Sequence, residues 1–141
     1  MTTADPSTGD PSTAPGRAAA RFGTQAWPLE IRANSADRTL SVDFDTGETF
    51  TYTAELLRVE SPSAEVQGHS PSQKQIVPGK RAVAILAVEP VGHYAVRIRF
   101  DDGHATGIYT WSYLHELGGI QDALWQAYLD ALAARGLSRD A

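Results

Sequence analysis

The chain has 141 residues, of which 42% are hydrophobic and 21% charged, as expected for one globular domain. It contains no cysteine, which excludes disulfides, thiolate zinc sites, iron–sulfur ligation by thiolates and cysteine nucleophiles. Its net charge of −5 opposes binding to nucleic acid or anionic lipid. No apolar run is long enough to cross a membrane, and the polar first residues do not resemble a secretory signal, so we expect a cytoplasmic protein.

The first 26 residues differ in composition from the rest of the chain. They are rich in Pro, Ser, Thr, Ala and Gly, and Phe22 is their one large apolar residue after the initiator Met. Such a segment buries too little apolar surface to offset the entropy lost on ordering. The sequence therefore predicts a disordered tail over residues 1–26.

From Trp27 onward, apolar and polar residues alternate with the period of a half-buried strand. The alternation runs over residues 29–32 and 40–45, and it resumes over 50–53 after the turn residues 45–48. These segments predict antiparallel strands that include a β-hairpin. Thr53 is a suitable N-cap for a short helix over residues 54–59.

The middle of the chain has weaker periodicity. Residues 60–81 contain three prolines and two glycines, which predicts a long surface loop, and loops of that length are often functional. The apolar run over residues 82–88 predicts a strand buried on both faces. A second hairpin follows, in which residues 94–100 turn at residues 101–103 into a short strand near residues 105–109.

Helical spacing marks the C-terminal part. Trp111, Leu114 and Leu117 share one helical face, and the pair Gly118-Gly119 is expected to end that helix. Apolar stripes then predict an amphipathic helix within residues 119–141 that packs on the domain or, as the less favoured alternative, on a partner. The predicted fold is α+β, with one small, mostly antiparallel sheet of about five to six strands, two short helices and a C-terminal helix.

No catalytic signature appears in the sequence. Ser61 and Ser63 lie outside any G-x-S-x-G elbow, and Gly79-Lys80 lacks the other residues of a phosphate-binding loop. No histidine belongs to an H-E-x-x-H, H-x-D or H-x-E motif. We therefore predict that the chain is not an enzyme. His104 follows a tight turn, where solvent exposure is the simplest expectation.

Three separated motifs carry a family resemblance. The segments Ser61-Pro-Ser-Ala-Glu-Val-Gln-Gly-His69, Glu89-Pro-Val-Gly-His-Tyr94 and Asp101-Asp-Gly-His104 occur in order. With Tyr109-Thr-Trp111-Ser-Tyr-Leu114, they resemble the N-terminal domain of gamma-butyrobetaine hydroxylase. The closer likeness is to the short bacterial proteins that consist of this domain and are catalogued as a domain of unknown function. The resemblance covers residues 27–118, which we take as the domain.

The resemblance implies a small α+β unit that holds a structural zinc through three cysteines and one histidine and precedes a catalytic domain dependent on iron and 2-oxoglutarate. The cysteine positions correspond here to Ser61, Ser63 and Val66, and His104 corresponds to the histidine. Because hydroxyl and valine side chains do not replace thiolates, we expect the family zinc site to be lost and no cofactor to be bound. The short segment after Leu117 cannot hold the catalytic domain, so carnitine synthesis is not implied.

The family also resembles a module appended to Mrp-type P-loop ATPases that carry iron–sulfur clusters, which implies a protein partner. The leading hypothesis is a non-catalytic binding or adaptor module linked to iron–sulfur or related cofactor metabolism. Its expected contact region is the 60–81 loop and the surface around His104, with candidate residues Ser61, Ser63, Glu65, Gln67, His69 and His104. The alternative is a metal- or small-ligand-binding domain in which His104 converges with His69, His93 or both, for example on iron. The sequence gives no oligomeric state.

Overall fold

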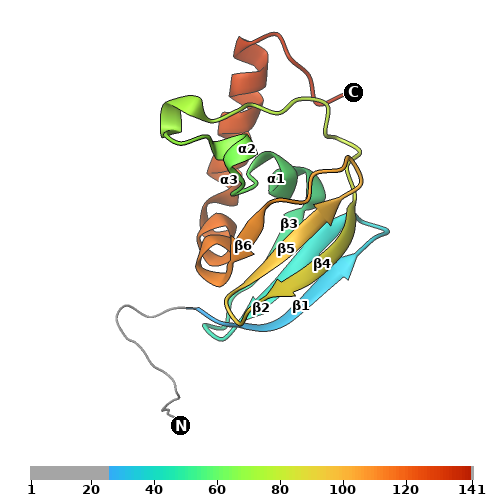
Figure 1. The fold of residues 1–141 in the computed structure, drawn as a ribbon, viewed down its shortest axis with the longest axis vertical. Coiled ribbons are helices and arrows are strands. Elements are labelled where there is room, and N and C mark those ends of the chain that lie inside the picture. Colours follow the sequence, from blue (N-terminus) through green and yellow to red (C-terminus); the bar gives the residue numbers. More distant parts are fainter. Residues whose placement is uncertain (1–25, 141) are drawn as a thin grey trace.

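The structure, a computed structural model, describes residues 26–140 (Figure 1). Nearly all of the tail predicted over residues 1–26 lies outside the described residues. The elements, in chain order, are β1 (Pro28–Asn34), β2 (Thr39–Phe44), β3 (Thr49–Thr53), α1 (Ala54–Val59), α2 (Ala64–Gln67), the 3₁₀ helix η1 (Pro71–Gln73), β4 (Ile85–Val91), β5 (Ala95–Phe100), β6 (Ile108–Thr110) and α3 (Trp111–Ala134). No helix of the described part has the length and apolar character needed to span a bilayer.

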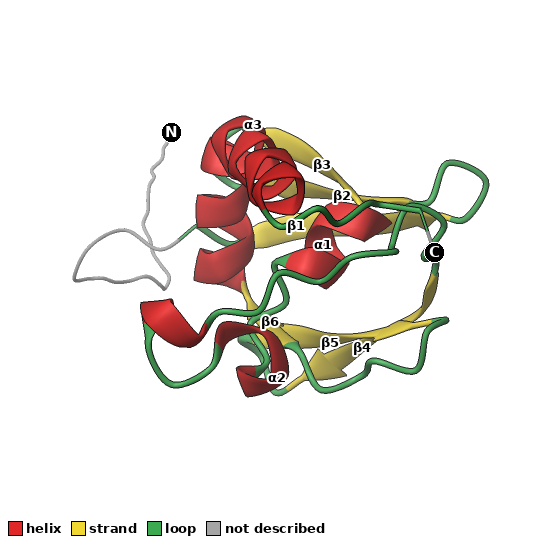
Figure 2. Cartoon of the chain, turned by 90° about the horizontal axis from the view of Figure 1, so that it is seen from above, coloured by secondary structure: helices red, strands yellow, loops and turns green. Residues whose placement is uncertain are grey.

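The strands form two antiparallel sheets of three strands each, in the orders β1-β2-β3 and β4-β5-β6. This corrects the prediction of one sheet, although the α+β class, the antiparallel pairing and the six strands agree with it. Figure 2 shows the sheets as two layers. Each sheet has one apolar face, and the two faces share a core that includes Val42 and Phe44 of β2 and Ile98 and Phe100 of β5. Alternation predicts that each strand has a buried face, but not which sheet covers it.

The helices close one side of this sandwich. Helix α3 contacts β3 and β6, and α1 contacts β3, whereas β1 and β4 lie at the other side (Figures 1 and 2). As predicted, Thr53 caps α1, since its hydroxyl accepts a hydrogen bond of 3.0 Å from the Leu56 N–H. Helix α1 therefore starts directly at the end of β3, the last strand of the first sheet.

Strand β4 differs from the expectation of a doubly buried strand over residues 82–88. It begins at Ile85, forms the edge of its sheet, and contains a register shift between Ile85 and Ala87. Leu86, at this irregularity, is 67% exposed. A continuous apolar run predicts burial, but a bulge turns one of these side chains toward solvent.

Helix α3 continues through Gly118 and Gly119, where the sequence predicted an end. Gly118 lies against the ring of Phe50, so that a Cβ at this position would be 2.3 Å from ring atoms. The glycine thus permits close packing of helix against sheet and does not serve as a C-cap. The second half of α3 packs on its own domain, because Tyr128 and Leu132 bury with Val59 of α1.

The chain after α3 folds back onto the domain. The Gly79 N–H donates to the Ser138 carbonyl at 2.9 Å, and the Arg139 guanidinium makes two hydrogen bonds of 2.7 and 2.8 Å to the Glu55 carboxylate. The guanidinium carbon of Arg139 lies 5.1 Å from the centroid of the Trp125 ring. These contacts fasten the C-terminal segment to α1 and α3.

The two glycines of α3 should respond oppositely to alanine. Gly118→Ala forces a methyl group into the Phe50 ring, and we expect a loss of about 1–2 kcal/mol in the free energy of unfolding. A Cβ at Gly119 meets no atom within 4 Å, so Gly119→Ala should stabilise by about 0.5–1 kcal/mol through helix propensity. Urea denaturation of both variants measures this. Equal shifts of the same sign would contradict a continuous, closely packed α3.

Candidate functional site

The 60–81 segment, predicted as a surface loop, begins as an ordered corner. Ser63 caps α2, with its Oγ accepting a hydrogen bond of 3.1 Å from the Glu65 N–H. Val66, on the inner side of this short helix, is buried, and its carbonyl accepts a hydrogen bond of 2.6 Å from the Gln75 N–H. The corner therefore has buried contacts of its own.

His104 is buried beneath this corner, which corrects the expectation of a solvent-exposed turn histidine. Its side chain is only 3% exposed. The turn after β5 brings the ring inward, because the Phe100 N–H donates to the His104 carbonyl at 2.9 Å and the His104 N–H donates to Asp102 Oδ1 at 3.0 Å. A turn position alone does not indicate burial of the side chain.

Both ring nitrogens of His104 have partners. Nδ1 lies 3.1 Å from Glu65 Oε1, and Nε2 lies 2.9 Å from Ser61 Oγ. An ionised carboxylate only accepts, so Nδ1 carries the proton in the neutral ring and Nε2 accepts from the Ser61 hydroxyl. Burial lowers the pKa of His104, and Arg58 lowers it further, against the raising effects of Glu65 and Asp102. The arrangement is therefore that of a neutral imidazole.

Further hydrogen bonds tie the corner to residues 104–107. Ser63 Oγ lies 2.8 Å from Thr106 Oγ1, and within the corner Ser61 Oγ accepts a hydrogen bond of 3.3 Å from the Ser63 N–H. A Cβ at Gly107 would be only 2.4 Å from Ser61 Oγ, so glycine permits this close approach. We call Ser61, Ser63, Glu65, His104 and Thr106 the His104 cluster.

A charged group lies beside the cluster. The Asp102 carboxylate is 2.7 Å from Arg58 Nε and 2.8 Å from Lys80 Nζ. Burial by itself would raise the pKa of Asp102, but hydrogen bonds from Lys80, the His104 N–H and Arg58 outweigh it and lower the pKa to about 2. Asp102 thus links α1, the end of the 60–81 segment and the His104 turn.

The order Glu65–His104–Ser61 has the connectivity of a Ser-His-acid catalytic triad. Catalysis also needs access of a substrate to the hydroxyl, whereas Ser61 is 0% exposed and Gly107 lies directly against its oxygen. The nearby Ser63 N–H is directed to Ser61 Oγ itself, and so is not free to stabilise an oxyanion. The arrangement is suited to holding structure and not to acyl transfer.

The other two candidate histidines lie apart from this cluster. His69 is exposed after α2, and its backbone N–H donates to Gln73 Oε1 at 2.8 Å. His93 is exposed in the turn before β5, and its carbonyl accepts a hydrogen bond of 2.8 Å from Trp111 Nε1. Among the described residues, no group of three or more His, Asp or Glu side chains is placed to hold a metal ion.

The structure also permits a test of the zinc site that the resemblance implies. Ser61 and Ser63 supply hydroxyls that are already hydrogen-bonded, Val66 supplies no donor, and Nε2 of His104 is engaged by Ser61. A tetrahedral zinc site needs nitrogen, thiolate or carboxylate ligands with free lone pairs. These residues do not fit the ion.

The candidate contact residues divide by exposure. Glu65, with a side chain 64% exposed, and His69 face solvent, whereas Ser61, Ser63 and His104 are buried. Gln67 is half-buried and donates to the Ser61 carbonyl at 2.9 Å. Sequence reasoning did not find Thr106, or the charged group of Arg58, Lys80 and Asp102, because these residues come from segments far apart in the chain.

Two stacked antiparallel sheets, closed on one side by α1 and α3, define a small α+β domain. Residues 31–115 match the family described as gamma-butyrobetaine hydroxylase-like, N-terminal. The chain therefore belongs to this family, and the resemblance carried by the three motifs is confirmed.

Solved structures support this assignment. Two of them are each titled as an NMR solution structure of the protein. One is 44% identical, and the match covers 83% of this chain and 92% of that chain with a TM-score of 0.72. The other is 42% identical, and the match covers 86% of this chain and 91% of that chain with a TM-score of 0.73. A crystal structure of a protein with unknown function in the DUF971 family, from Acidithiobacillus ferrooxidans, is 48% identical over 64% of this chain and 91% of that chain, with a TM-score of 0.55. No curated protein matches.

The His104 cluster predicts a pH dependence of stability. Because the pKa of His104 is lowered in the folded protein, the unfolded chain takes up the proton first as pH falls. The neutral His104 ring therefore contributes its full stabilisation above the ordinary histidine pKa of about 6.5. This contribution is lost as the pH falls through the lower pKa that His104 has in the folded protein. Between pH 7 and pH 5, the unfolding free energy of the wild type should fall, and that of His104→Gln should be lower but flatter.

Urea denaturation across this pH range measures both curves. His69→Gln is the control, because His69 is exposed, and this variant should retain the wild-type slope. A wild-type curve as flat as that of His104→Gln would show that His104 is not held neutral by the cluster.

Proposed function

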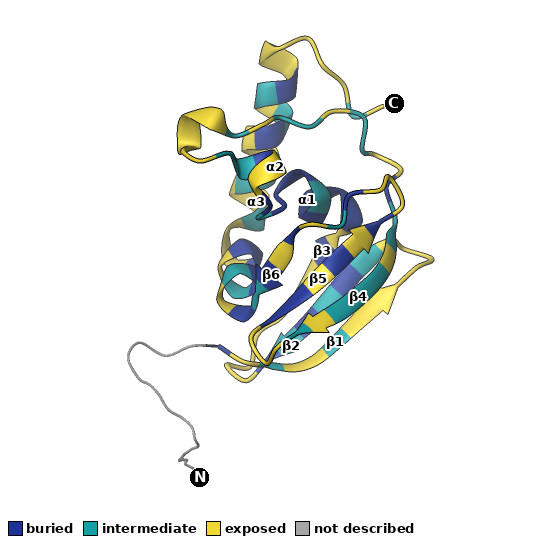
Figure 3. Cartoon of the chain, viewed as in Figure 1, coloured by how far each residue is buried: buried dark blue, intermediate teal, exposed yellow. Residues whose placement is uncertain are grey.

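We propose that this chain is a non-catalytic protein-binding module whose contact surface is the protruding segment of residues 64–75. The observation that carries the proposal is that buried contacts at both ends fix this segment, while its outer residues face solvent. Figure 3 shows the exposed side of the segment, which projects from the body of the domain. We call residues 64–75 the α2–η1 segment.

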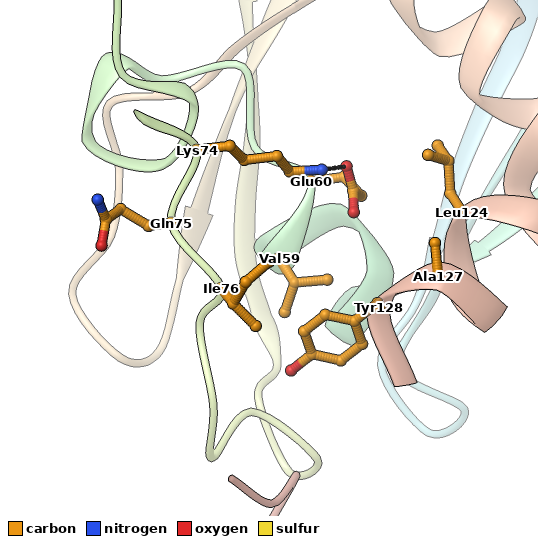
Figure 4. A pocket seen from close by; sticks show the side chains of 8 residues that line it. All are labelled: Val59, Glu60, Lys74, Gln75, Ile76, Leu124, Ala127 and Tyr128. Atoms are coloured by element: carbon orange, nitrogen blue, oxygen red, sulfur yellow. Dashed lines mark hydrogen bonds and ion pairs between the residues drawn. The ribbon is translucent and has the colours of Figure 1, made fainter. Parts of the chain in front are cut away.

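The first end of the α2–η1 segment is held by the His104 cluster. The second end is held at the C-terminal end of α1, where Lys74 Nζ lies 2.6 Å from Oε1 of the C-cap residue Glu60, whose side chain is only 6% exposed. Figure 4 shows this ion pair at the rim of a small pocket of about 90 Å³, in which Ile76 and Val59 face Tyr128. Anchors at both ends reduce the entropy that the segment loses on binding.

The inside of the α2–η1 segment is also tightly organised. Gly68 has a φ of 68°, and a Cβ there would be 2.4 Å from the Gln73 Cβ, so glycine allows the chain to close on itself. A continuous run of five residues at its tip is exposed, namely His69, Ser70, Pro71, Ser72 and Gln73. This surface is convex, whereas small-molecule sites are concave, and the net charge of −5 disfavours nucleic acid. A protein is the partner that suits it best.

The family resemblance suggests which partner to test first. A related module is appended to Mrp-type ATPases that carry iron–sulfur clusters, and we propose such a carrier in the cytoplasm as the partner. This chain has no cysteine, so it would contribute a docking surface and no thiolate ligand to a cluster. The proposed role in iron–sulfur or related cofactor metabolism rests on this resemblance.

A bulky charge on the α2–η1 segment should weaken binding without unfolding the domain. Ser72→Arg changes an exposed residue of η1, and Ala133→Arg is a matched control on the exposed side of α3. We expect the wild type and Ala133→Arg to bind a purified Mrp-type carrier equally, and Ser72→Arg to bind at least tenfold more weakly. Calorimetric titration of the purified proteins measures this.

Affinity capture from the native host, quantified by mass spectrometry, extends the test to other protein partners. Proteins retained by the wild type and Ala133→Arg but lost with Ser72→Arg would support the contact surface. Equal capture by all three forms, or capture of none above background, would contradict it.

A further inference from the structure

The side of the sandwich opposite the helices is open. Strand β1 pairs with β2, and β4 pairs with β5, but within the described residues no strand pairs with the outer edge of either. Both edges lie at the same side of the two layers (Figures 1 and 2). Each therefore presents a row of backbone N–H and C=O groups to solvent.

A hollow of about 390 Å³ lies between these two edges. This volume falls within the usual range of about 300–1,000 Å³ for ligand pockets and is large enough for a few residues of extended chain. Two segments line the hollow. They are the β1–β2 turn with its flanking strand ends (Ala33, Asn34, Ser35, Arg38 and Thr39) and the start of β4 with the residue before it (Ala84, Ile85, Leu86, Ala87 and Val88). We call this hollow the β1–β4 groove.

The β1–β4 groove has a distinctive charge. Arg38 is the one charged residue of its lining, and no carboxylate lines it, although the chain as a whole is acidic. The neighbouring Asp37 carboxylate is engaged by Asn34 Nδ2 at 3.2 Å. Arg38 also has a φ of 53°, an uncommon conformation for this residue, and its carbonyl accepts a hydrogen bond of 2.9 Å from the Ala54 N–H. The backbone at this cation is thus fixed in an unusual turn.

The β4 side supplies apolar contact. The register shift between Ile85 and Ala87 interrupts regular pairing around Leu86, a residue that is 67% exposed and lines the groove. Bulges at sheet edges commonly re-aim a side chain. The groove therefore combines unpaired backbone, an exposed leucine and one cation.

We propose that the β1–β4 groove binds an extended peptide segment of a partner protein that carries a carboxylate. The peptide backbone would add to an edge strand, its apolar side chains would contact Leu86, and its carboxylate would lie at Arg38. This surface is separate from the α2–η1 segment and does not depend on the function proposed for it.

A peptide titration followed by ¹H–¹⁵N NMR tests the proposal on the full chain. The probe is an acetylated hexapeptide of alternating threonine and valine with a free C-terminal carboxylate. We expect saturable shift changes centred on residues 33–39 and 84–88. N-methylation of alternate peptide bonds should weaken binding roughly tenfold or more, because it removes backbone donors.

The charge contribution is tested with matched pairs. Replacing the peptide carboxylate by an amide should weaken binding about two- to fivefold, and Arg38→Gln should do the same. The control is Arg32→Gln, since Arg32 lies on β1 but pairs with Asp43 at 2.7 Å and does not line the groove. This variant should bind the peptide as the wild type does.

Several results would overturn the proposal. These are shift changes confined to other residues, binding unaffected by N-methylation, or no change at millimolar peptide. Changes at the groove that depend on protein concentration alone would assign it to a second copy of the chain. Changes produced by deleting residues 1–25, without peptide, would assign it to that segment.

Discussion

The buried ring of His104 is the contact on which the exposed surface of this domain depends. One nitrogen faces Glu65 and the other faces Ser61, so that a single side chain joins the turn after β5 to the corner that starts α2. A neutral imidazole suits this role because it donates at one nitrogen and accepts at the other. Removing either partner would leave a buried polar atom unsatisfied, which typically costs about 1–3 kcal/mol.

This contact joins the segments on which the family resemblance places a zinc site. The serine hydroxyls at two of the corresponding positions bond to His104 and Thr106, and the valine at the third is buried. Hydrogen bonds and apolar packing thus bring these segments together. The same chemistry accounts for a triad-like order of side chains in which Ser61 is fully buried.

Local sequence patterns predicted the α+β class, the antiparallel strands and the cap of α1 at Thr53, because each depends on neighbouring residues. They misassigned Gly118, whose role is close packing against Phe50, a contact between positions far apart in the chain. They also predicted one sheet and an exposed His104, since alternation and turn chemistry do not specify what covers a face. The family motifs did identify Ser61 and His104 as related positions, but not the hydrogen bond between them.

Two different surfaces follow from the arrangement of the layers. The helices close the β3 and β6 side and hold the α2–η1 segment, whereas the β1 and β4 side keeps two unpaired edges (Figure 1). A convex, anchored segment suits docking on the surface of a folded protein, and open sheet edges suit an extended chain. The two proposed binding surfaces therefore lie on different sides of the domain.

The state of the His104 ring tests this account most directly. Two-bond ¹H–¹⁵N correlation NMR of the imidazole should show, at neutral pH, a neutral ring protonated at Nδ1, with a spectrum unchanged by added zinc or by a chelator. Nitrogen shifts of a metal-bound ring, protonation at Nε2, or rapid exchange typical of a solvent-exposed imidazole would contradict the central role given to the His104 cluster.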